Sequence, residues 1–318
     1  MIEPVRIAVI GAGSFGRNHL RVLRQLESAK LAAVVDTDDR RARESAAQFE
    51  CEAVTELAAL SGRVDAAVVA TPTVTHAEIG CALLEQGIDV LVEKPIANDV
   101  SSAERLIETA ARCGRILQAG HLERFNPAVT ALRKMVRNPL FFEVHRLSLF
   151  SPRSLDVDVV LDLMIHDLDI VLTLTGRLPE EIRAAGISIL SPKVDIANVR
   201  LAFPGGCIAN LTASRVSTER VRKIRLFQPR QYLSLDYARQ DLIAFEVSPS
   251  NQIGFQSVPV EKDEPLKLEL ASFLESVQSR RVTGVTGEEA LRALRVALEI
   301  LDKIEFHARV VAQSLAGA

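Results

Sequence analysis

The stretch Val5-Arg-Ile-Ala-Val-Ile10-Gly11-Ala-Gly-Ser-Phe-Gly16 decides the fold expected for this chain. Its first half is a short apolar run with β-branched residues that ends at a glycine, which is typical of a buried parallel strand. Its second half has the glycine spacing GxGxxG and leads into a segment of helical character at 14–27. We therefore expect a strand, a tight glycine turn and a helix, in that order.

The same alternation continues through the first 120 residues. Further short apolar runs are separated by segments long enough for a helix, and two of those segments end at a glycine. Strands joined through helices form crossover connections, which produce a doubly wound parallel sheet. The expected strands are 31–35, 64–70, 88–92 and 115–119, and the expected helices are 38–49, 75–86 and 100–113.

The rhythm changes after about residue 120. A strand-like stretch at 140–150 and a helix at 157–174 are followed, from 182 to 258, by strand-like runs joined by turns. Such runs predict a mostly antiparallel sheet, followed by helices at 265–280 and 287–308. The predicted fold class is α/β, with domains at 1–120 and 121–318 whose C-terminal helices can pack back on the first domain. Without a long linker, the cleft between the domains is the natural ligand site.

The composition is that of a globular protein. The chain has 318 residues, with 48% hydrophobic residues, 25% charged residues and a net charge of −3. This balance excludes intrinsic disorder and makes nucleic acid or a membrane surface a poor partner. The four cysteines lie far apart, without zinc-site spacing, and no signal peptide or membrane span is apparent. We expect a cytoplasmic protein without a disulfide framework or a metal site.

The glycine turn has the context that a dinucleotide requires. Gly11 allows the tight turn, Gly13 lets a pyrophosphate approach the backbone, and Gly16 lets the helix pack closely on the strand. The helix N-terminus, at Ser14 and Phe15, offers N–H groups to the phosphates. The alternative is a glycine turn without a ligand.

Asp36 follows Gly16 by 20 residues, at the end of the second strand. A carboxylate there accepts hydrogen bonds from the adenosine ribose hydroxyls. It also opposes a 2′-phosphate charge about 4 Å away by roughly 4 kcal/mol at an effective dielectric constant of about 20. The sequence therefore predicts NAD, with NADP less favoured. Arg40 and Arg41 can offset this penalty, although a solvated helix face paired with Glu44 is the interpretation we favour.

Glu93-Lys94-Pro95 follows the strand 88–92, at the edge of the sheet where ligands bind. A lysine there can hold a substrate hydroxyl or carry charge near the reacting part of the cofactor. The alternative is a surface lysine before a turn-forming proline.

A polar stripe marks the helix expected at 157–174. Asp162, His166 and Asp169 are spaced i, i+4 and i+7 on an otherwise apolar helix. Histidine suits proton transfer because its ordinary pKa lies near neutrality, and a carboxylate one turn away can orient the ring. The alternatives are structural polar residues at a domain interface, or half of a metal site for which no further ligand cluster exists.

Five segments together resemble the glucose–fructose oxidoreductase / inositol dehydrogenase / MocA (Gfo/Idh/MocA) family. This resemblance implies an N-terminal Rossmann domain and a C-terminal α/β domain whose open sheet serves in oligomer contacts. It also implies NAD(P)-dependent oxidation or reduction of a carbinol carbon, and a homodimer or homotetramer. The segments are Gly11 to Gly16, Ala70-Thr71-Pro72 with His76, Glu93-Lys94-Pro95, Arg124-Phe125-Asn126-Pro127, and Asp162 with His166.

The resemblance also assigns roles to individual residues. Thr71, Pro72 and His76 are expected to line the cofactor path. Glu93 and Lys94 are expected near the nicotinamide, with a cis peptide bond between Lys94 and Pro95. Asp162 and His166 are expected to face the reacting carbon, with His166 as the leading proton acceptor. We further expect Lys94 to donate a hydrogen bond to the substrate hydroxyl oxygen whose proton His166 accepts.

Within the family, segments 120–127 and 161–169 are most similar to the branch acting on nucleotide sugars. Members of that branch oxidise the 3-hydroxyl of UDP-N-acetylglucosamine or its uronate, one route leading to lipid A precursors. Arg124, Asn126 and Arg153 are then candidates for substrate binding, although the arginines can instead pair with Glu123 and Asp156. The alternatives are a free-sugar or inositol dehydrogenase, and a sensor that binds dinucleotide or sugar without turnover.

Overall fold

The computed structural model describes residues 3–150 and 157–316. By contacts the chain divides into two compact units. Unit 1 comprises the residues up to Phe125 together with Asp263–Leu291. Unit 2 comprises Asn126–Lys262 and the chain from Arg292 onward, so the division falls within helix α8 (Gly287–Ala316). Each unit is described by itself below.

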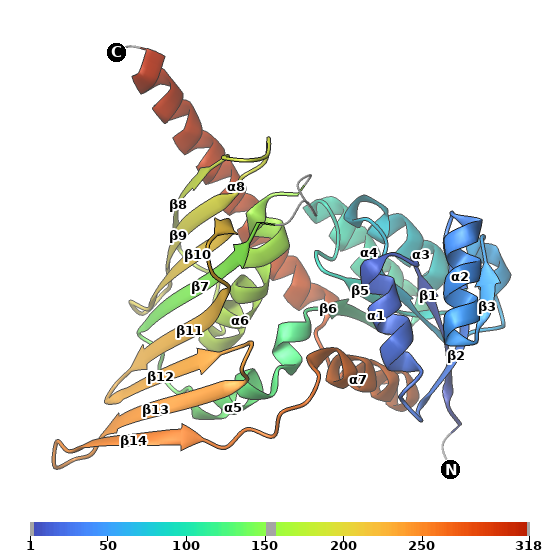
Figure 1. Ribbon diagram of the computed structural model, residues 1–318, viewed down its shortest axis with the longest axis horizontal. Helices are drawn as coiled ribbons and strands as arrows, with labels where there is room; N and C mark the ends of the chain where they lie inside the picture. Colours follow the sequence, from blue (N-terminus) through green and yellow to red (C-terminus); the bar gives the residue numbers. More distant parts are fainter. Residues whose placement is uncertain (1–2, 151–156, 317–318) are drawn as a thin grey trace. The chain divides into compact units, whose positions relative to one another are not determined.

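Unit 1 contains the predicted parallel sheet, whose strands run in the order β3-β2-β1-β4-β5-β6 (Figure 1). Its central strands are buried along their whole length, which explains why they are continuously apolar in sequence. The three-residue strand β3 was not predicted, because it is too short to produce a hydrophobic pattern. The strands are β1 (Val5–Ile10), β2 (Ala29–Val35), β3 (Glu52–Val54), β4 (Ala66–Val69), β5 (Asp89–Glu93) and β6 (Leu117–Gly120).

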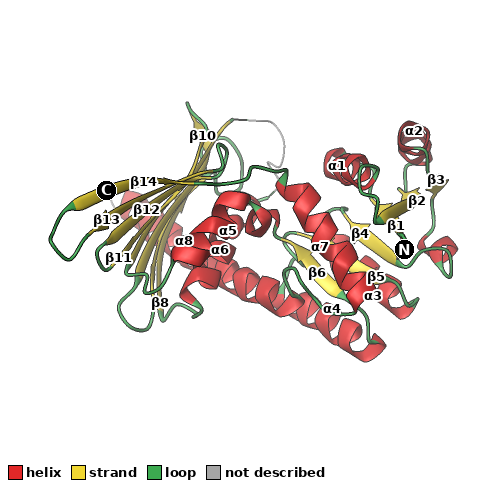
Figure 2. Cartoon of the chain, turned by 90° about the horizontal axis from the view of Figure 1, so that it is seen from below, coloured by secondary structure: helices red, strands yellow, loops and turns green. Residues whose placement is uncertain are grey.

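The helices of unit 1 lie on both faces of this sheet. Figure 2 shows α1 and α2 on one side of the strands and α3 and α4 on the other. Helix α7, from the C-terminal part of the chain, packs against α1 and β1. The helices are α1 (Ser14–Leu23), α2 (Asp39–Phe49), α3 (His76–Glu85), α4 (Val100–Cys113) and α7 (Pro265–Ser279), with 3₁₀ turns at Leu57–Leu60, Thr73–Thr75 and Leu122–Phe125.

Aspartate side chains cap the start of two of these helices, and a glycine ends one of them. The Asp38 side chain accepts a hydrogen bond from the Arg41 backbone N–H, and that of Asp99 accepts one from Ser102. Such caps satisfy backbone donors that the first turn leaves unpaired. At the other end of α4, Gly114 adopts the left-handed conformation typical of a helix C-terminus.

Unit 2 is built on a mixed, mostly antiparallel sheet with the order β14-β13-β12-β11-β7-β10-β9-β8. The pair β7 and β10 is parallel, and the other neighbouring strands are antiparallel. The predicted α/β fold class is therefore confirmed. The strands are β7 (Phe141–Leu149), β8 (Glu181–Ile187), β9 (Ile196–Ala202), β10 (Ile208–Ser217), β11 (Val221–Gln228), β12 (Gln231–Asp236), β13 (Asp241–Val247) and β14 (Ile253–Val258).

Helices cover one face of the unit 2 sheet. Helices α5 (Pro127–Met135), α6 (Ile165–Thr175) and the later part of α8 supply one side of an apolar core, and alternate strand residues supply the other. Along β7, buried positions such as Phe142 and Val144 alternate with partly exposed ones. Helix α5 was not predicted, although Asn126 and Pro127 are residues typical of a helix start and its buried residues Ala128, Val129 and Leu132 have helical spacing.

The other face of this sheet carries a row of aromatic side chains on adjacent strands. The rings pair across neighbouring strands at centroid distances of 4.8–5.9 Å. Several of them are accessible, and Phe255 at the end of the row is 65% exposed. The row consists of Phe141, Phe227, Tyr232, Phe245 and Phe255.

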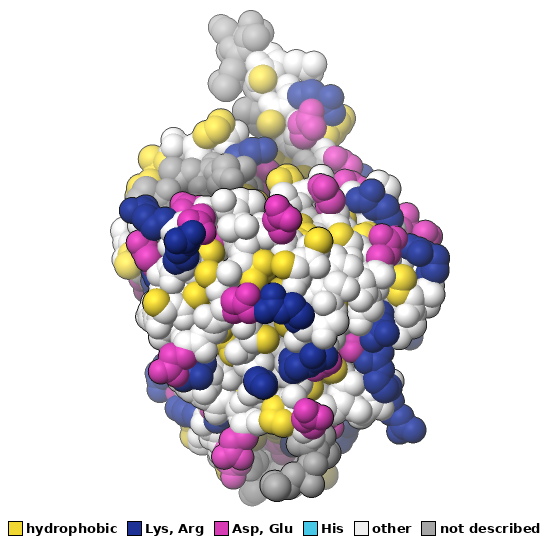
Figure 3. All heavy atoms as spheres, turned by 90° about the vertical axis from the view of Figure 1, so that its right-hand side faces the viewer, with side chains coloured by type: hydrophobic (Ala, Val, Ile, Leu, Met, Phe, Trp, Pro, Cys, Tyr) yellow, Lys and Arg dark blue, Asp and Glu magenta, His cyan; other side chains and the backbone are white. Residues whose placement is uncertain are grey.

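The surface carries mixed charges. Figure 3 looks onto the side of Figure 1 where α2 and β3 lie, and shows acidic and basic groups interspersed. On α2 the pairs Arg40–Glu44 and Arg43–Asp39 have the i, i+4 spacing of helix-surface ion pairs. All four cysteines are free thiols. In the part of the chain that the structure describes, no helix is long and apolar enough to span a bilayer.

Candidate cofactor and catalytic sites

The glycine turn after β1 has no room for side chains at two of its positions. Gly11 has a φ of +99°, and a Cβ there would lie 2.6 Å from the Ala70 carbonyl oxygen. A Cβ on Gly16 would lie 1.8 Å from the Gly11 carbonyl oxygen. These contacts account for two of the three glycines in the motif.

The same turn is open where a dinucleotide phosphate would lie. A Cβ on Gly13 would meet no atom within 4 Å. Gly13 is also the N-cap of α1, and no side chain caps that helix end. Ser14 and Phe15 are exposed in the first turn. The backbone N–H groups at this helix end thus fit an anionic ligand, as the sequence predicts.

Asp36, at the end of β2, is buried and hydrogen-bonded on both oxygens. Its Oδ2 accepts from the Ala12 backbone N–H at 2.8 Å, which ties it to the glycine turn. Its Oδ1 accepts from the Asp38 backbone N–H at 2.9 Å and from Arg41 Nη2 at 3.1 Å. The interpretation that Arg41 pairs with Glu44 was therefore wrong: Arg40 pairs with Glu44, and Arg41 turns back to Asp36 and Asp38.

The loop after β4 is held by His76, the first residue of α3. His76 Nε2 lies 2.9 Å from the Thr71 carbonyl oxygen, and Nδ1 lies 2.9 Å from that of Pro95. Burial lowers the pKa of His76 below its usual value, although both carbonyl contacts oppose that shift. The buried ring thus joins the loops after β4 and β5, while Pro72 is exposed.

Glu93 ends β5, and Lys94 follows it. The peptide bond between Lys94 and Pro95 is cis, as the family resemblance predicts. The Glu93 carboxylate is buried, lies 2.7 Å from His19 Nε2, and accepts the Lys94 backbone N–H at 3.2 Å. Gly120 on β6 faces it, and a Cβ there would lie 3.0 Å from this carboxylate. Lys94 itself is partly exposed.

Glu269 on α7 is a second buried carboxyl near Glu93. It is 1% exposed, and neither of its oxygens has a hydrogen-bond partner among the described residues. Burial, together with the Glu93 charge, raises the pKa of Glu269 well above its usual value. Sequence analysis missed His19 and Glu269. Each could have been found in the sequence as a polar residue on the otherwise apolar face of its helix, α1 for His19 and α7 for Glu269.

The segment with Asp162 and His166 belongs to unit 2. A continuous α-helix from 157 was predicted, but the structure has a π-helical turn at Val160–Met164, followed by α6. Asp162 lies in this wider turn, so the α-helical i, i+4 geometry does not describe its relation to His166. Both side chains are partly buried. Turns of this kind are frequent at functional sites.

Sequence analysis also missed the partner of the adjacent Asp167. Both Asp167 oxygens accept hydrogen bonds from Arg146 on β7, at 2.7 and 2.9 Å. Arg146 is 2% exposed, and its guanidinium lies 5.0 Å from the centre of the Tyr237 ring. This buried pair fixes the start of α6 to the sheet, next to His166.

The remaining candidates from sequence have structural partners. Arg124 pairs at 2.8 Å with Glu289, in the first turn of α8. Asn126 is the N-cap of α5, accepts the Ala128 backbone N–H at 3.1 Å, and donates to the Tyr237 carbonyl oxygen at 3.0 Å. Arg153 lies outside the described residues.

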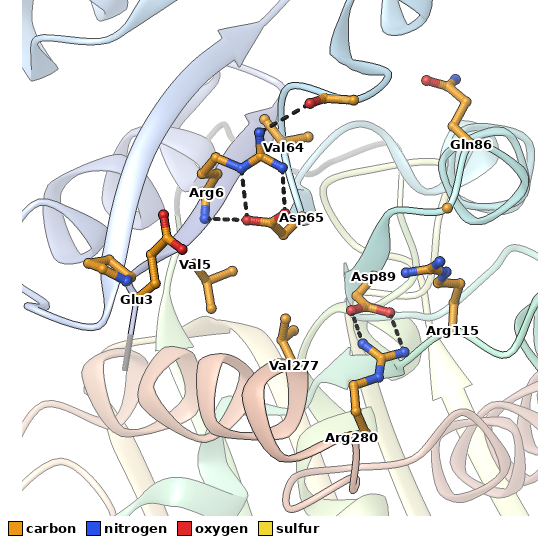
Figure 4. A pocket seen from close by; sticks show the side chains of 13 residues that line it. Glu3, Val5, Arg6, Val64, Asp65, Gln86, Asp89, Arg115, Val277 and Arg280 are labelled. Carbon is orange, nitrogen blue, oxygen red and sulfur yellow. Dashed lines mark hydrogen bonds and ion pairs between the residues drawn. The ribbon is translucent and has the colours of Figure 1, made fainter. Parts of the chain in front are cut away.

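A cavity of about 630 Å³ lies at the opposite, amino-terminal edge of the unit 1 sheet (Figure 4). Two of its arginines are neutralised, Arg6 by Asp65 and Arg280 by Asp89. The glycine turn, Asp36, Thr71 and Glu93 follow the carboxyl ends of their strands, so this cavity is separate from them. Among the described residues, no group of three or more His, Cys, Asp or Glu side chains could hold a metal ion.

Comparisons with known proteins agree with this geometry. The profile described as "Oxidoreductase family, NAD-binding Rossmann fold" matches residues 5–121, and the "GFO/IDH/MocA C-terminal domain" matches residues 141–230. UDP-N-acetylglucosamine 3-dehydrogenase of Acidithiobacillus ferrooxidans is 35% identical over 95% of this chain and 97% of its own length. A myo-inositol 2-dehydrogenase of Thermotoga maritima is 27% identical over 91% of this chain and 93% of its own.

Solved structures extend the likeness to the fold. A structure of the Acidithiobacillus ferrooxidans enzyme has a TM-score of 0.90 at 36% identity, covering 96% of this chain and 99% of that one. A myo-inositol 2-dehydrogenase from Lactobacillus plantarum, with a TM-score of 0.81 at 18% identity, covers 96% of this chain and 98% of its own and shares the fold. The chain therefore belongs to the Gfo/Idh/MocA family of NAD(P)-dependent oxidoreductases, which act on CH–OH groups of sugars and related compounds.

Proposed function

We propose that this dehydrogenase oxidises the 3-hydroxyl of a UDP-N-acetylhexosamine with NAD, in the synthesis of amino-sugar precursors such as those of lipid A. The observation that carries the proposal is the 35% identity, over nearly the whole of both chains, to UDP-N-acetylglucosamine 3-dehydrogenase of Acidithiobacillus ferrooxidans. The 3-keto product is a suitable substrate for an aminotransferase. Nucleotide sugars are water-soluble substrates, which agrees with a cytoplasmic location for the protein.

The proposed cofactor site lies along the carboxyl ends of the unit 1 strands. The N-terminus of α1, at Gly13, Ser14 and Phe15, holds the pyrophosphate, and Asp36 holds the adenosine ribose. Thr71, Pro72 and His76 continue the path. Glu93 and Lys94 then lie beside the nicotinamide. When bound, NAD supplies the hydride acceptor for the reaction.

The proposed catalytic groups come from both units. His166 takes the proton from the substrate hydroxyl, and Asp162 orients the imidazole and stabilises its charged form. Lys94, kept cationic, donates a hydrogen bond to the same oxygen and stabilises its developing negative charge. The proposal thus requires that His166 and Lys94 converge on one substrate oxygen. A neutral Lys94 acting as the base is the alternative, and it requires desolvation that lowers its pKa.

The diphosphate of a nucleotide sugar needs cations or N–H donors. Arg124, Asn126 and Arg153 are the proposed groups. Since Arg124 pairs with Glu289 in the structure, a diphosphate would have to compete with that carboxylate or share the guanidinium with it. The five donors of a guanidinium allow such sharing.

A free-sugar or inositol dehydrogenase is a second candidate, favoured by the 27% identity to the Thermotoga maritima inositol enzyme over 91% of this chain. A third candidate, from another class, is a sensor that binds dinucleotide and sugar without turnover. Lys94 and His166 argue against the sensor, because binding alone needs neither proton transfer nor a hydride geometry.

We also propose that the open sheet face of unit 2 joins two copies of this chain in a homodimer or homotetramer. The aromatic row from Phe141 to Phe255 supports this, because accessible aromatic rings in a continuous row are typical of interfaces.

The test is NADH formation by the purified protein with NAD and a panel of sugars, in the presence of a carbonyl trap. We expect turnover with UDP-N-acetylglucosamine or a related UDP-sugar, but not with myo-inositol or free hexoses. Turnover with inositol alone would support the second candidate. A flat absorbance together with a ligand-induced rise in melting temperature would identify a sensor.

A further inference from the structure

Glu93, in the Glu93–Lys94 segment of unit 1, interacts with two other buried titratable side chains. Glu93 comes from β5, His19 from α1 and Glu269 from α7. They are 5%, 0% and 1% exposed. The proposed mechanism uses neither His19 nor Glu269. Ionisable groups are rarely buried to this extent unless they are paired or neutral, so the cluster needs an explanation.

The geometry fixes the position of the Glu93 carboxylate. His19 Nε2 lies 2.7 Å from Oε1, and the Lys94 backbone N–H reaches Oε2 at 3.2 Å. Gly120 leaves room for this carboxylate, because a Cβ at that position would lie only 3.0 Å from it. Both oxygens thus have donors, which suits the charged form of Glu93.

The hydrogen bonds also indicate the charge of the other two members. His19 Nδ1 is buried without a hydrogen-bond partner among the described residues, so a neutral ring that donates through Nε2 leaves no buried N–H donor unpaired. Glu269 has no donor at either oxygen, and an ionised carboxylate there would lack all compensation. Outside this cluster, His76 on α3 interacts electrostatically with Glu93 and with Lys94, which follows Glu93 in the chain.

We propose that the cluster holds one negative charge at neutral pH, on Glu93, and that His19 is the positioning residue that keeps it there. Glu269 is the uncharged neighbour. The inference rests on the proposed placement of the nicotinamide beside Glu93. A fixed carboxylate at that place favours the oxidised ring, which is cationic, over the reduced ring, which is neutral.

The functional test compares the dissociation constants of NAD⁺ and NADH at neutral pH, without any sugar. Glu93→Gln is expected to lower the preference for NAD⁺ over NADH on the order of tenfold. His19→Leu is expected to lower this preference as well, because the Glu93 carboxylate then loses the hydrogen-bond partner of its Oε1. His19→Gln, which retains an N–H donor, is expected to restore part of the preference.

An infrared difference spectrum tests the charge of Glu269. The wild type is expected to show the carbonyl band of a protonated carboxylic acid, which Glu269→Gln removes. Glu275→Gln, at an exposed position on the same helix, is the matched control and retains the band. Persistence of the band in Glu269→Gln, or its absence from the wild type, would overturn the single-charge assignment.

The two proposals fail in different ways. An unchanged nucleotide preference in Glu93→Gln, or equal effects of His19→Leu and His19→Gln, would overturn the inference even in an active enzyme. Conversely, a protein with the expected nucleotide preferences but no turnover of any UDP-sugar would overturn the proposed function and leave the inference in place.

Discussion

The guanidinium of Arg41 lies 3.1 Å from the carboxylate of Asp36, and this pair sits at the end of β2 where the adenosine ribose is proposed to bind. Asp36 is buried, whereas the Arg41 side chain is 51% exposed. In the proposed site, the acid expected to disfavour a 2′-phosphate therefore has beside it a cation able to accept one. We expect the preference between NAD and NADP to depend on the balance of the two.

Replacement of the acid is expected to move that balance toward NADP. In Asp36→Asn the repulsion of a 2′-phosphate is removed and Arg41 is released to contact it. We expect the ratio of kcat/KM for NAD to that for NADP to fall on the order of a hundredfold. Asp39→Asn, an exposed change at the start of α2, is the control and should leave the ratio unchanged. An unaltered ratio in Asp36→Asn would contradict the role of Asp36.

Arg41 is expected to matter once Asp36 is gone. In the Asp36→Asn background, Arg41→Ala should raise the KM for NADP several-fold and leave that for NAD nearly unchanged. Arg40→Ala is the matched control, because Arg40 pairs with Glu44 on the outer face of α2. Equal effects of the two arginine changes would show that Arg41 acts only through the general surface charge.

Lys94→Ala and His166→Ala are both expected to lower kcat by roughly 10²- to 10⁴-fold, because each removes a group proposed to act on the substrate oxygen. NAD binding, measured by fluorescence titration with NADH or by calorimetry, should persist in both variants. His307→Ala, on α8, is the control for loss of a histidine. Near wild-type turnover in either variant would remove that residue from the mechanism.

Glu269→Gln is expected to stabilise unit 1 at neutral pH. The pKa of Glu269 is raised in the folded state, so ionisation in the unfolded state costs the wild type stability as the pH rises above the ordinary glutamate pKa. Glutamine does not ionise and removes this cost. The melting temperature of the variant relative to the wild type should therefore be higher at pH 7 than at pH 4.

The pH series contains its own control. Below the ordinary glutamate pKa both states of the wild type are protonated at Glu269, and the gain should vanish there. Glu275→Gln should show no such pH-dependent gain. A gain that is equal at both pH values would mean that packing, and not the charge, is responsible.

The aromatic row gives a prediction about assembly. Phe245→Glu places a charge between Tyr232 and Phe255, and we expect it to convert the proposed oligomer into monomers in analytical ultracentrifugation. Phe306→Glu, at an exposed position on α8, is the matched control because it adds the same charge away from the sheet. An oligomer that survives Phe245→Glu would exclude this face as the interface.

The Arg146–Asp167 pair is expected to stabilise unit 2. Arg146→Ala removes both hydrogen bonds that this guanidinium donates to the buried Asp167 carboxylate, and should cost about 3–5 kcal/mol of unfolding free energy. Arg225→Ala breaks the partly exposed pair with Glu143 and should cost at most about 1 kcal/mol. Urea unfolding of the two variants compares these costs directly, and similar values would contradict the importance of burial.

Much of unit 1 follows from local sequence. Gly11, Gly16 and Asp36 stand at fixed distances along one strand–turn–helix–strand segment, so their relation is determined by chain geometry alone. The apolar runs of β1, β4 and β5 are continuous because both faces of the sheet are covered. The short strand β3 and the π-helical turn before α6 were missed, because each is too short or too irregular to produce a periodic pattern. Helix α5 was missed although its sequence has the start signals and spacing of a short helix.

What the sequence by itself determined is the order of the elements, the cofactor-binding turn and the family. Tertiary structure decided which distant side chains meet: Glu93 with His19 and Glu269, Arg146 with Asp167, and the five rings across five strands. Sequence spacing reaches only a few residues along a helix or strand, whereas His19 and Glu93 are 74 residues apart and Arg146 and Asp167 are 21 residues apart, so both pairs meet through packing. Charge state follows from burial, and burial is a property of the folded chain.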